Sequence, residues 1–99
     1  GRKQVSLSSK ILRPNSSGFD AILRIDLNSS NCSDSQIEVW GLNGKLQSVI
    51  ENGIEENNIC SFFWELTNTK GDLLLPGTYI VRICRGSIDC VLSVVCIVY

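Results

Sequence analysis

The feature that most constrains the fold is a series of short segments in which apolar and polar residues alternate, with almost no helical periodicity. In Phe19–Leu27, apolar side chains from Ala21 onward alternate with Arg24 and Asp26. Successive side chains of a strand point to opposite faces, so this period of two predicts strands that each bury one face. Polar, Gly-rich or Pro-containing stretches separate these segments, as is typical of an all-β protein.

Seven strands are predicted from this pattern. They are Val5–Arg13, Phe19–Leu27, Gln36–Leu42, Lys45–Ile50, Cys60–Leu66, Thr78–Arg85 and Val91–Val98. Two antiparallel sheets packed face to face would bury all of their apolar faces, which favours an antiparallel β-sandwich of about seven strands. The 99 residues suit a single domain spanning 1–99, with residues 1–4 expected to be a linker or the remnant of a tag.

Two turns carry specific expectations. Asn43-Gly44 lies between two apolar segments, and both residue types tolerate the positive φ that a type I′ hairpin requires. In Leu75-Pro76-Gly77, Pro suits the first central position of a type II turn and Gly the second. We therefore predict a type I′ hairpin at Asn43-Gly44, and a type II corner that starts the strand containing Tyr79.

The aromatic residues divide into two groups. Trp64 shares a predicted inward face with Phe62 and is expected to anchor the core. Phe63 and Trp40 fall on faces with polar neighbours, so they are the better candidates for a contact surface. A carbohydrate platform built on Trp40 and Phe63 is one hypothesis, and a core role for most aromatics is the alternative.

The chain has five cysteines, an odd number, so one at least stays unpaired within the chain. The spacing of Cys84 and Cys90 suits a bridge across a hairpin. The alternative is that most cysteines are small buried hydrophobic residues. With no histidine and no C-x-x-C motif, a zinc site is not predicted.

The last ten residues form the most apolar stretch of the chain. They are apolar on both predicted faces and lack charged side chains, which indicates a strand that is covered on both sides or meets a partner. The candidate recognition residues are Val91, Leu92, Val94, Val95, Ile97, Val98 and Tyr99. A homodimer through this terminal strand, formed by addition or exchange, is a further expectation.

Composition argues against several classes of function. The net charge of −1 gives no electrostatic reason to expect nucleic acid or an anionic membrane as a partner. The longest apolar run, Cys90–Tyr99, is about half of what a membrane-spanning helix needs. There is no histidine, phosphate-binding loop, nucleophile elbow or calcium loop. We therefore expect neither an enzyme nor a bound cofactor or metal.

Taken in order, the motifs resemble the C-terminal sorting domains of type IX secretion cargo, and are similar to flagellar-hook-cap-like immunoglobulin domains. The matching residues are Pro14, Asn15, Gly18, Asn43, Gly44, Lys45, Trp64, Gly71, Pro76, Gly77, Thr78 and Tyr79. The resemblance extends from about Ile11 to Tyr99 and implies an immunoglobulin-like fold. The apolar closing strand differs from typical cargo, which favours a domain retained on a surface component, such as the sortase-like peptidase of that system.

The resemblance implies a non-catalytic signal that directs its parent protein through the periplasm to the outer-membrane surface or the medium. Its expected partners are the secretion translocon and the surface sortase components. The alternative is an accessory immunoglobulin-like spacer beside a secreted surface enzyme. Carbohydrate binding through Trp40 and Phe63 is the third hypothesis.

Overall fold

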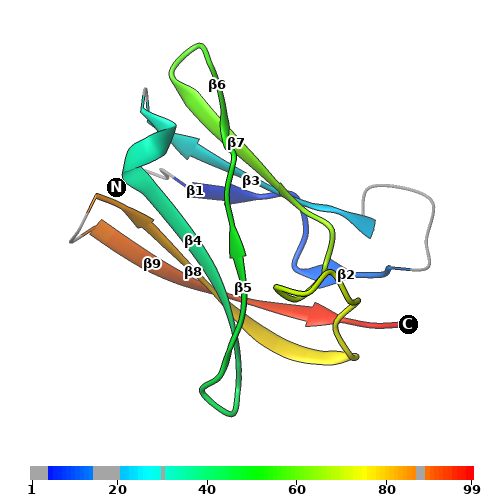
Figure 1. Cartoon of the computed structure of the whole chain (residues 1–99). Helices are drawn as coiled ribbons and strands as arrows, with labels where there is room; N and C mark the ends of the chain where they lie inside the picture. Colours follow the sequence, from blue (N-terminus) through cyan, green and yellow to red (C-terminus); the bar gives the residue numbers. More distant parts are fainter. Residues whose placement is uncertain (1–4, 15–20, 30, 87–88) are drawn as a thin grey trace.

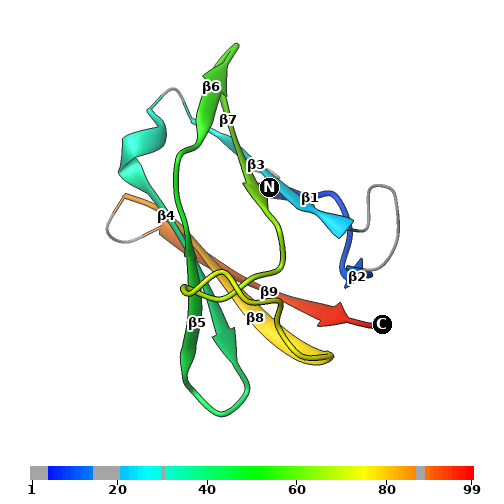
Figure 2. The same ribbon diagram turned by 45° about the vertical axis from the view of Figure 1, so that its right-hand side comes forward.

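Two β-sheets pack face to face in the computed structural model, which describes residues 5–14, 21–29, 31–86 and 89–99 (Figures 1 and 2). The four-stranded sheet contains, in spatial order, β1 (Val5–Leu7), β3 (Leu23–Asn28), β7 (Ile59–Trp64) and β6 (Ile54–Glu56). The five-stranded sheet contains β2 (Ile11–Leu12), β9 (Asp89–Ile97), β8 (Gly77–Arg85), β4 (Ser35–Gly41) and β5 (Leu46–Ile50). The predicted all-β sandwich is confirmed.

The strand order is that of an immunoglobulin sandwich. Such sandwiches place strands A, B, E and D in one sheet and C, F and G in the other. Here β1-β3-β7-β6 takes the first order, and β4, β8 and β9 take the second, with β5 added beside β4. The pairings are antiparallel, except that β2 runs parallel to β9.

The core lies between the sheets and is built from the inward faces that alternation predicts. Leu23, Ile25 and Leu27 of β3 are fully buried, and Phe62 and Trp64 of β7 are 2% and 3% exposed. The indole Nε1 of Trp64 donates a 2.9 Å hydrogen bond to the carbonyl oxygen of Thr67, which satisfies its polar atom. The prediction that Trp64 anchors the core is confirmed.

The predicted first strand, Val5–Arg13, is two strands, because the chain crosses from one sheet to the other. The hydroxyl oxygen of Ser9 accepts a hydrogen bond from the backbone N–H of Ile11 and donates one to its carbonyl oxygen. This local turn shifts the alternation, so Leu12 is fully buried and Ile11 is about half exposed. The crossing adds one strand to the predicted seven.

The second additional strand is β6, which lies in a segment predicted to be a polar connection. All three residues of β6 are exposed, so the segment shows no alternation. It pairs with β7 through a two-residue turn in which Asn57 has φ 55° and Asn58 has φ 64°. Positive φ at both positions is the type I′ geometry.

The hairpin at Asn43-Gly44 forms, but the type I′ prediction is wrong. β4 and β5 pair antiparallel as expected. The backbone N–H of Gly44 donates to the carbonyl oxygen of Gly41, so Leu42 and Asn43 are the central residues of the turn. Of the turn residues only Gly44 has a positive φ, 83°. This is the geometry of a longer hairpin loop that ends in a glycine with left-handed backbone.

The Pro76-Gly77 corner also differs from the predicted type II turn. Gly77 has φ 152°, far from the value near 80° that this turn needs, and it is already the first residue of β8. The chain enters β8 through a bend at Pro76. The predicted loop at Pro14–Gly18 and the start of the Phe19–Leu27 strand lie mostly outside the described residues.

Two disulfides link four of the five cysteines. The bridge between Cys84 and Cys90, one of the two alternatives for these cysteines, joins β8 to β9, with the two Cα atoms 4.0 Å apart. A second bridge joins Cys32, in the short 3₁₀ helix η2 (Cys32–Asp34), to Cys60 in β7. This bridge ties the segment entering one sheet to a central strand of the other. Cys96 is free and partly buried.

Candidate functional site

The predicted recognition residues, five in β9 and two just after it, fall into three groups. Val95 and Ile97 point inward and are buried in the core, so they are not available to a partner. Leu92 and Val94 point outward and are 67% and 53% exposed. The third group is Val91, Val98 and Tyr99, which are 43%, 38% and 49% exposed. The outward side chains of Leu92 and Val94 are thus left uncovered.

The side of β9 away from β8 is only partly paired. β8 pairs with β9 along its whole length, whereas β2 pairs only with Cys96 and Ile97. Within the described residues, no strand pairs with Asp89–Val95 on that side. We call this stretch the open edge.

Hydrogen-bond alternation shows which backbone groups face the open edge. The N–H of Cys96 points away from β8 and donates to the carbonyl oxygen of Lys10 at 2.9 Å. In an antiparallel pair, N–H and C=O groups alternate between the two sides with a period of two residues. The backbone groups of Val94 and Leu92 therefore also point away from β8, toward the open edge. Their side chains and backbone are both accessible to an added strand.

Three neighbouring strands place Leu92 and Val94 within a larger uncovered surface. The pairing register aligns Trp40, Ile80 and Val94 in one row and Glu38, Arg82 and Leu92 in the next. All six point away from the core, because they alternate with buried residues such as Val39, Val81 and Val95. We call these six residues the outer face. Trp40 and Ile80 are each partly buried there.

A polar cluster lies in the middle of the outer face. One carboxylate oxygen of Glu38 accepts hydrogen bonds from Trp40 Nε1 at 3.1 Å and from Arg82 Nη1 at 3.2 Å. The other accepts from Gln36 Nε2 at 3.3 Å. The cluster holds one negative and one positive charge side by side among apolar neighbours.

Phe63 lies on the opposite side of the molecule from Trp40. It points outward from the four-stranded sheet, is 49% exposed, and lies under the guanidinium of Arg24, 5.7 Å from the ring centre. Arg24 is itself held by an ion pair with Asp26. Because Phe63 and Trp40 occupy the outer surfaces of different sheets, they cannot form one carbohydrate platform.

The described residues that carry the resemblance to sorting domains lie in turns and in the core. Asn43, Gly44 and Lys45 form the β4–β5 turn, where Asn43 Oδ1 accepts a hydrogen bond from the N–H of Lys45 at 3.0 Å. Trp64 is in the core, and Pro76 and Gly77 form the corner before β8. Tyr79 is partly buried, and burial raises the pKa of its phenol, with a smaller contribution from Tyr99. Pro14 is described, but Asn15 and Gly18 lie outside the described residues.

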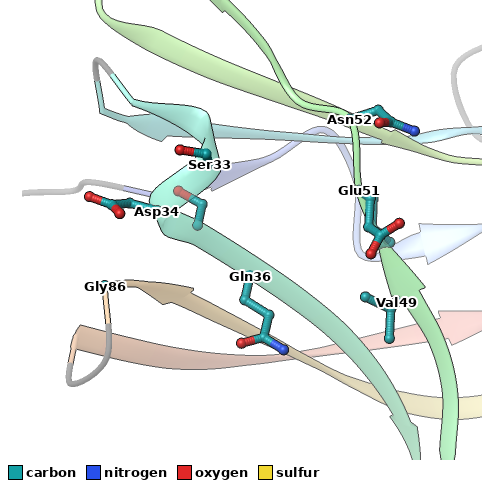
Figure 3. A pocket seen from close by; sticks show the side chains of 9 residues that line it. Ser33, Asp34, Gln36, Val49, Glu51, Asn52 and Gly86 are labelled. Carbon is teal, nitrogen blue, oxygen red and sulfur yellow. The ribbon is translucent and has the colours of Figure 1, made fainter.

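A polar hollow of about 430 Å³ lies between η2 and the end of β5 (Figure 3). Its two acidic residues, Asp34 and Glu51, lie on opposite sides of the hollow. Among the described residues, no three His, Cys, Asp or Glu side chains gather closely enough to hold a metal ion. No described helix is both long and apolar enough to cross a bilayer. The outer face and the open edge are therefore the better candidate site.

Comparison of the chain with family models, with curated proteins and with solved structures finds no match. The sequence pattern points to Trp40, Leu92 and Val94. It does not single out Glu38, Arg82 or Ile80, although alternation within β4 and β8 places all three at outward positions.

Proposed function

We propose that this domain is a non-catalytic recognition module that directs the protein carrying it through the type IX secretion system. Its route is the periplasm and then the outer-membrane surface or the medium. Its partners are components of the secretion translocon and the surface sortase machinery. Recognition takes place through protein–protein contact at β9.

The observation that carries the proposal is the exposure of Leu92 and Val94 beside the open edge. An extended segment of a partner can add to such an edge through main-chain hydrogen bonds, while neighbouring side chains supply specificity. Natural edge strands usually carry charges or other features that prevent this pairing. Over Cys90–Val95 the strand has no charged residue.

The two disulfides are compatible with the proposed route. Disulfides persist in oxidising compartments such as the bacterial periplasm and the cell surface. Cys32–Cys60 and Cys84–Cys90 would therefore form before or during export.

The experiment is a secretion assay with the domain fused to the C-terminus of a reporter, in a bacterium that uses this system. Because Val95 and Ile97 are core residues, deleting β9 would unfold the domain. The informative variant is therefore Leu92→Asp combined with Val94→Asp, which changes only outward side chains. We expect at least about a tenfold loss of reporter outside the cell, as for central contacts of an interface.

Ile54→Asp is the matched control. Ile54 is 61% exposed on β6, in the other sheet, so it loses a similar apolar side chain far from β9. Its secretion should equal that of the unchanged fusion. Normal export of the Leu92/Val94 variant, with unchanged thermal unfolding, would exclude the proposed surface.

The second candidate is an accessory immunoglobulin-like spacer, which the compact sandwich would also suit. A spacer predicts that removing the whole domain leaves export of the parent protein unchanged, and that only the stability of the neighbouring domain falls.

A further inference from the structure

The outer face, extended by Leu46 and Val49 of the neighbouring strand β5, is complementary to itself. In one row, Val49 of β5 lies beside Glu38, followed by Arg82 and then Leu92. The row thus reads apolar, negative, positive, apolar across four strands. If the same row of a second copy faces this one in the opposite direction, each charge lies against the opposite charge and each apolar residue against another apolar residue.

The next row has the same property. Leu46 of β5 lies beside Trp40, followed by Ile80 and Val94, so all four positions are apolar. Leu46 and Val49 are 43% and 37% exposed, so the apolar surface continues past β4 onto β5.

A two-fold axis parallel to the strands, between β4 and β8, would use this complementarity. Such an axis places β4 opposite β8 of a second copy, and β5 opposite β9. Glu38 then faces Arg82 of the second copy, Trp40 faces its Ile80, and Val49 faces its Leu92. Since a two-fold axis generates every contact twice, one register satisfies both charges of both copies.

We propose that the outer face binds a second copy of this chain, face to face, to form a two-fold symmetric dimer. Among possible partners, a second copy is favoured because the surface carries one charge of each sign in register and apolar residues on both flanks. A partner with an excess of one charge would place a like charge against Glu38 or Arg82. This dimer does not depend on the proposed role in secretion.

The size of the surface suggests a reversible dimer. Four strands about 4.8 Å apart and about six residues long present on the order of 400 Å² in projection. Over both copies this is about 800 Å², which is below the roughly 1,200–2,000 Å² of stable specific interfaces and suits a weak, transient contact. We expect a dissociation constant in the micromolar range, of about 10 to 100 µM.

The test is sedimentation equilibrium of the full chain with Glu38→Arg and Arg82→Glu, separately and mixed. Each single variant places like charges opposite each other in its own dimer, so each should associate at least about tenfold more weakly than the unchanged chain. An equimolar mixture should form a heterodimer, because the two arginines of one copy then face the two glutamates of the other.

Rescue on mixing separates the interface from any effect within one copy. Both variants lose the internal Glu38–Arg82 ion pair, and mixing cannot restore it. Ile54→Asp, on the other sheet, should leave association unchanged. An unchanged chain that is monomeric at a concentration of about 1 mM, well above the expected dissociation constant, would overturn the proposal. So would a mixture that stays as weak as its components. Association that resists both charge variants would instead indicate pairing through the open edge and would also overturn it.

Discussion

The phenolic oxygen of Tyr79 donates a 2.7 Å hydrogen bond to the carbonyl oxygen of Leu75, four residues earlier. In immunoglobulin sandwiches a tyrosine near the start of strand F closes the preceding corner in this way. Here the hydrogen bond holds Pro76 and Gly77 in the bend that starts β8. Strand β8 lies between β4 and β9 and pairs with both.

Tyr79→Phe should lower the free energy of unfolding by about 1 kcal/mol, because it removes one hydrogen bond and little apolar contact. Tyr99→Phe is the matched control. It removes a hydrogen bond of the same length to the carbonyl oxygen of Leu74, from a residue at the end of the chain that is 49% exposed. Urea unfolding should show the smaller loss for Tyr99→Phe. An equal or larger loss would contradict the role of the corner.

Alkaline pH should destabilise the domain through Tyr79. Burial, and to a lesser degree Tyr99, raises the pKa of the Tyr79 phenol in the folded state above its unfolded value of 10.0. The folded state therefore favours the protonated phenol. Stability relative to a chain without this group therefore falls as the pH rises from the unfolded value of 10.0 through the folded pKa, and levels off above it. Thermal unfolding of Tyr79→Phe should therefore differ from that of the unchanged chain in its pH dependence above pH 10.0, where the unfolded phenol begins to ionise. Parallel curves would show that Tyr79 does not titrate differently on folding.

The two disulfides should contribute unequally to stability. The Cys32–Cys60 bridge spans 28 residues and the Cys84–Cys90 bridge spans 6. Loop-closure entropy gives about 3.5 kcal/mol for the longer loop and about 2 kcal/mol for the shorter one. Cys32→Ala and Cys90→Ala each remove the more exposed partner, and urea unfolding should show the larger loss for Cys32→Ala. The reverse order would mean that the short bridge stabilises the fold by more than chain entropy.

Gly53→Ala should be destabilising, because there is no room for a side chain. A Cβ atom at Gly53 would lie 2.5 Å from Cζ of Phe62, whose ring is buried in the core. Overpacking of this kind costs about 2 to 3 kcal/mol. The loss should shrink when Phe62 is also replaced by Leu, which a double-mutant cycle would measure. Equal losses in both backgrounds would exclude the clash as the cause.

Much of the fold follows from alternation, because burial between two sheets selects every second residue. This is why the inward positions of β3 and β7 can be predicted from the sequence. The crossing at Ser9 is not predicted, since Val5, Leu7 and Ile11 all lie at odd-numbered positions, as they would in one strand, although the chain changes sheets between Leu7 and Ile11. Two serines in succession, at Ser8 and Ser9, are the local signal for a turn.

Other features depend on contacts that the local sequence does not contain. β6 is exposed on both sides, so only the Asn57-Asn58 turn could indicate a hairpin. The partner of Cys32 is set by how η2 meets the four-stranded sheet, which spacing cannot give. For the outer face, alternation supplies the outward positions, whereas the pairing of β4 with β8 decides that Glu38 meets Arg82.

The position of β9 has a consequence for the order of events during protein synthesis. Val95 and Ile97 complete the core, and β9 pairs both with β8 and with Ile11 and Leu12 near the start of the chain. A nascent polypeptide that lacks these residues has an incomplete hydrophobic core and no strand with which β2 can pair. The sandwich can therefore close only after Ile97 has left the ribosome, and until then the whole segment stays open to chaperones.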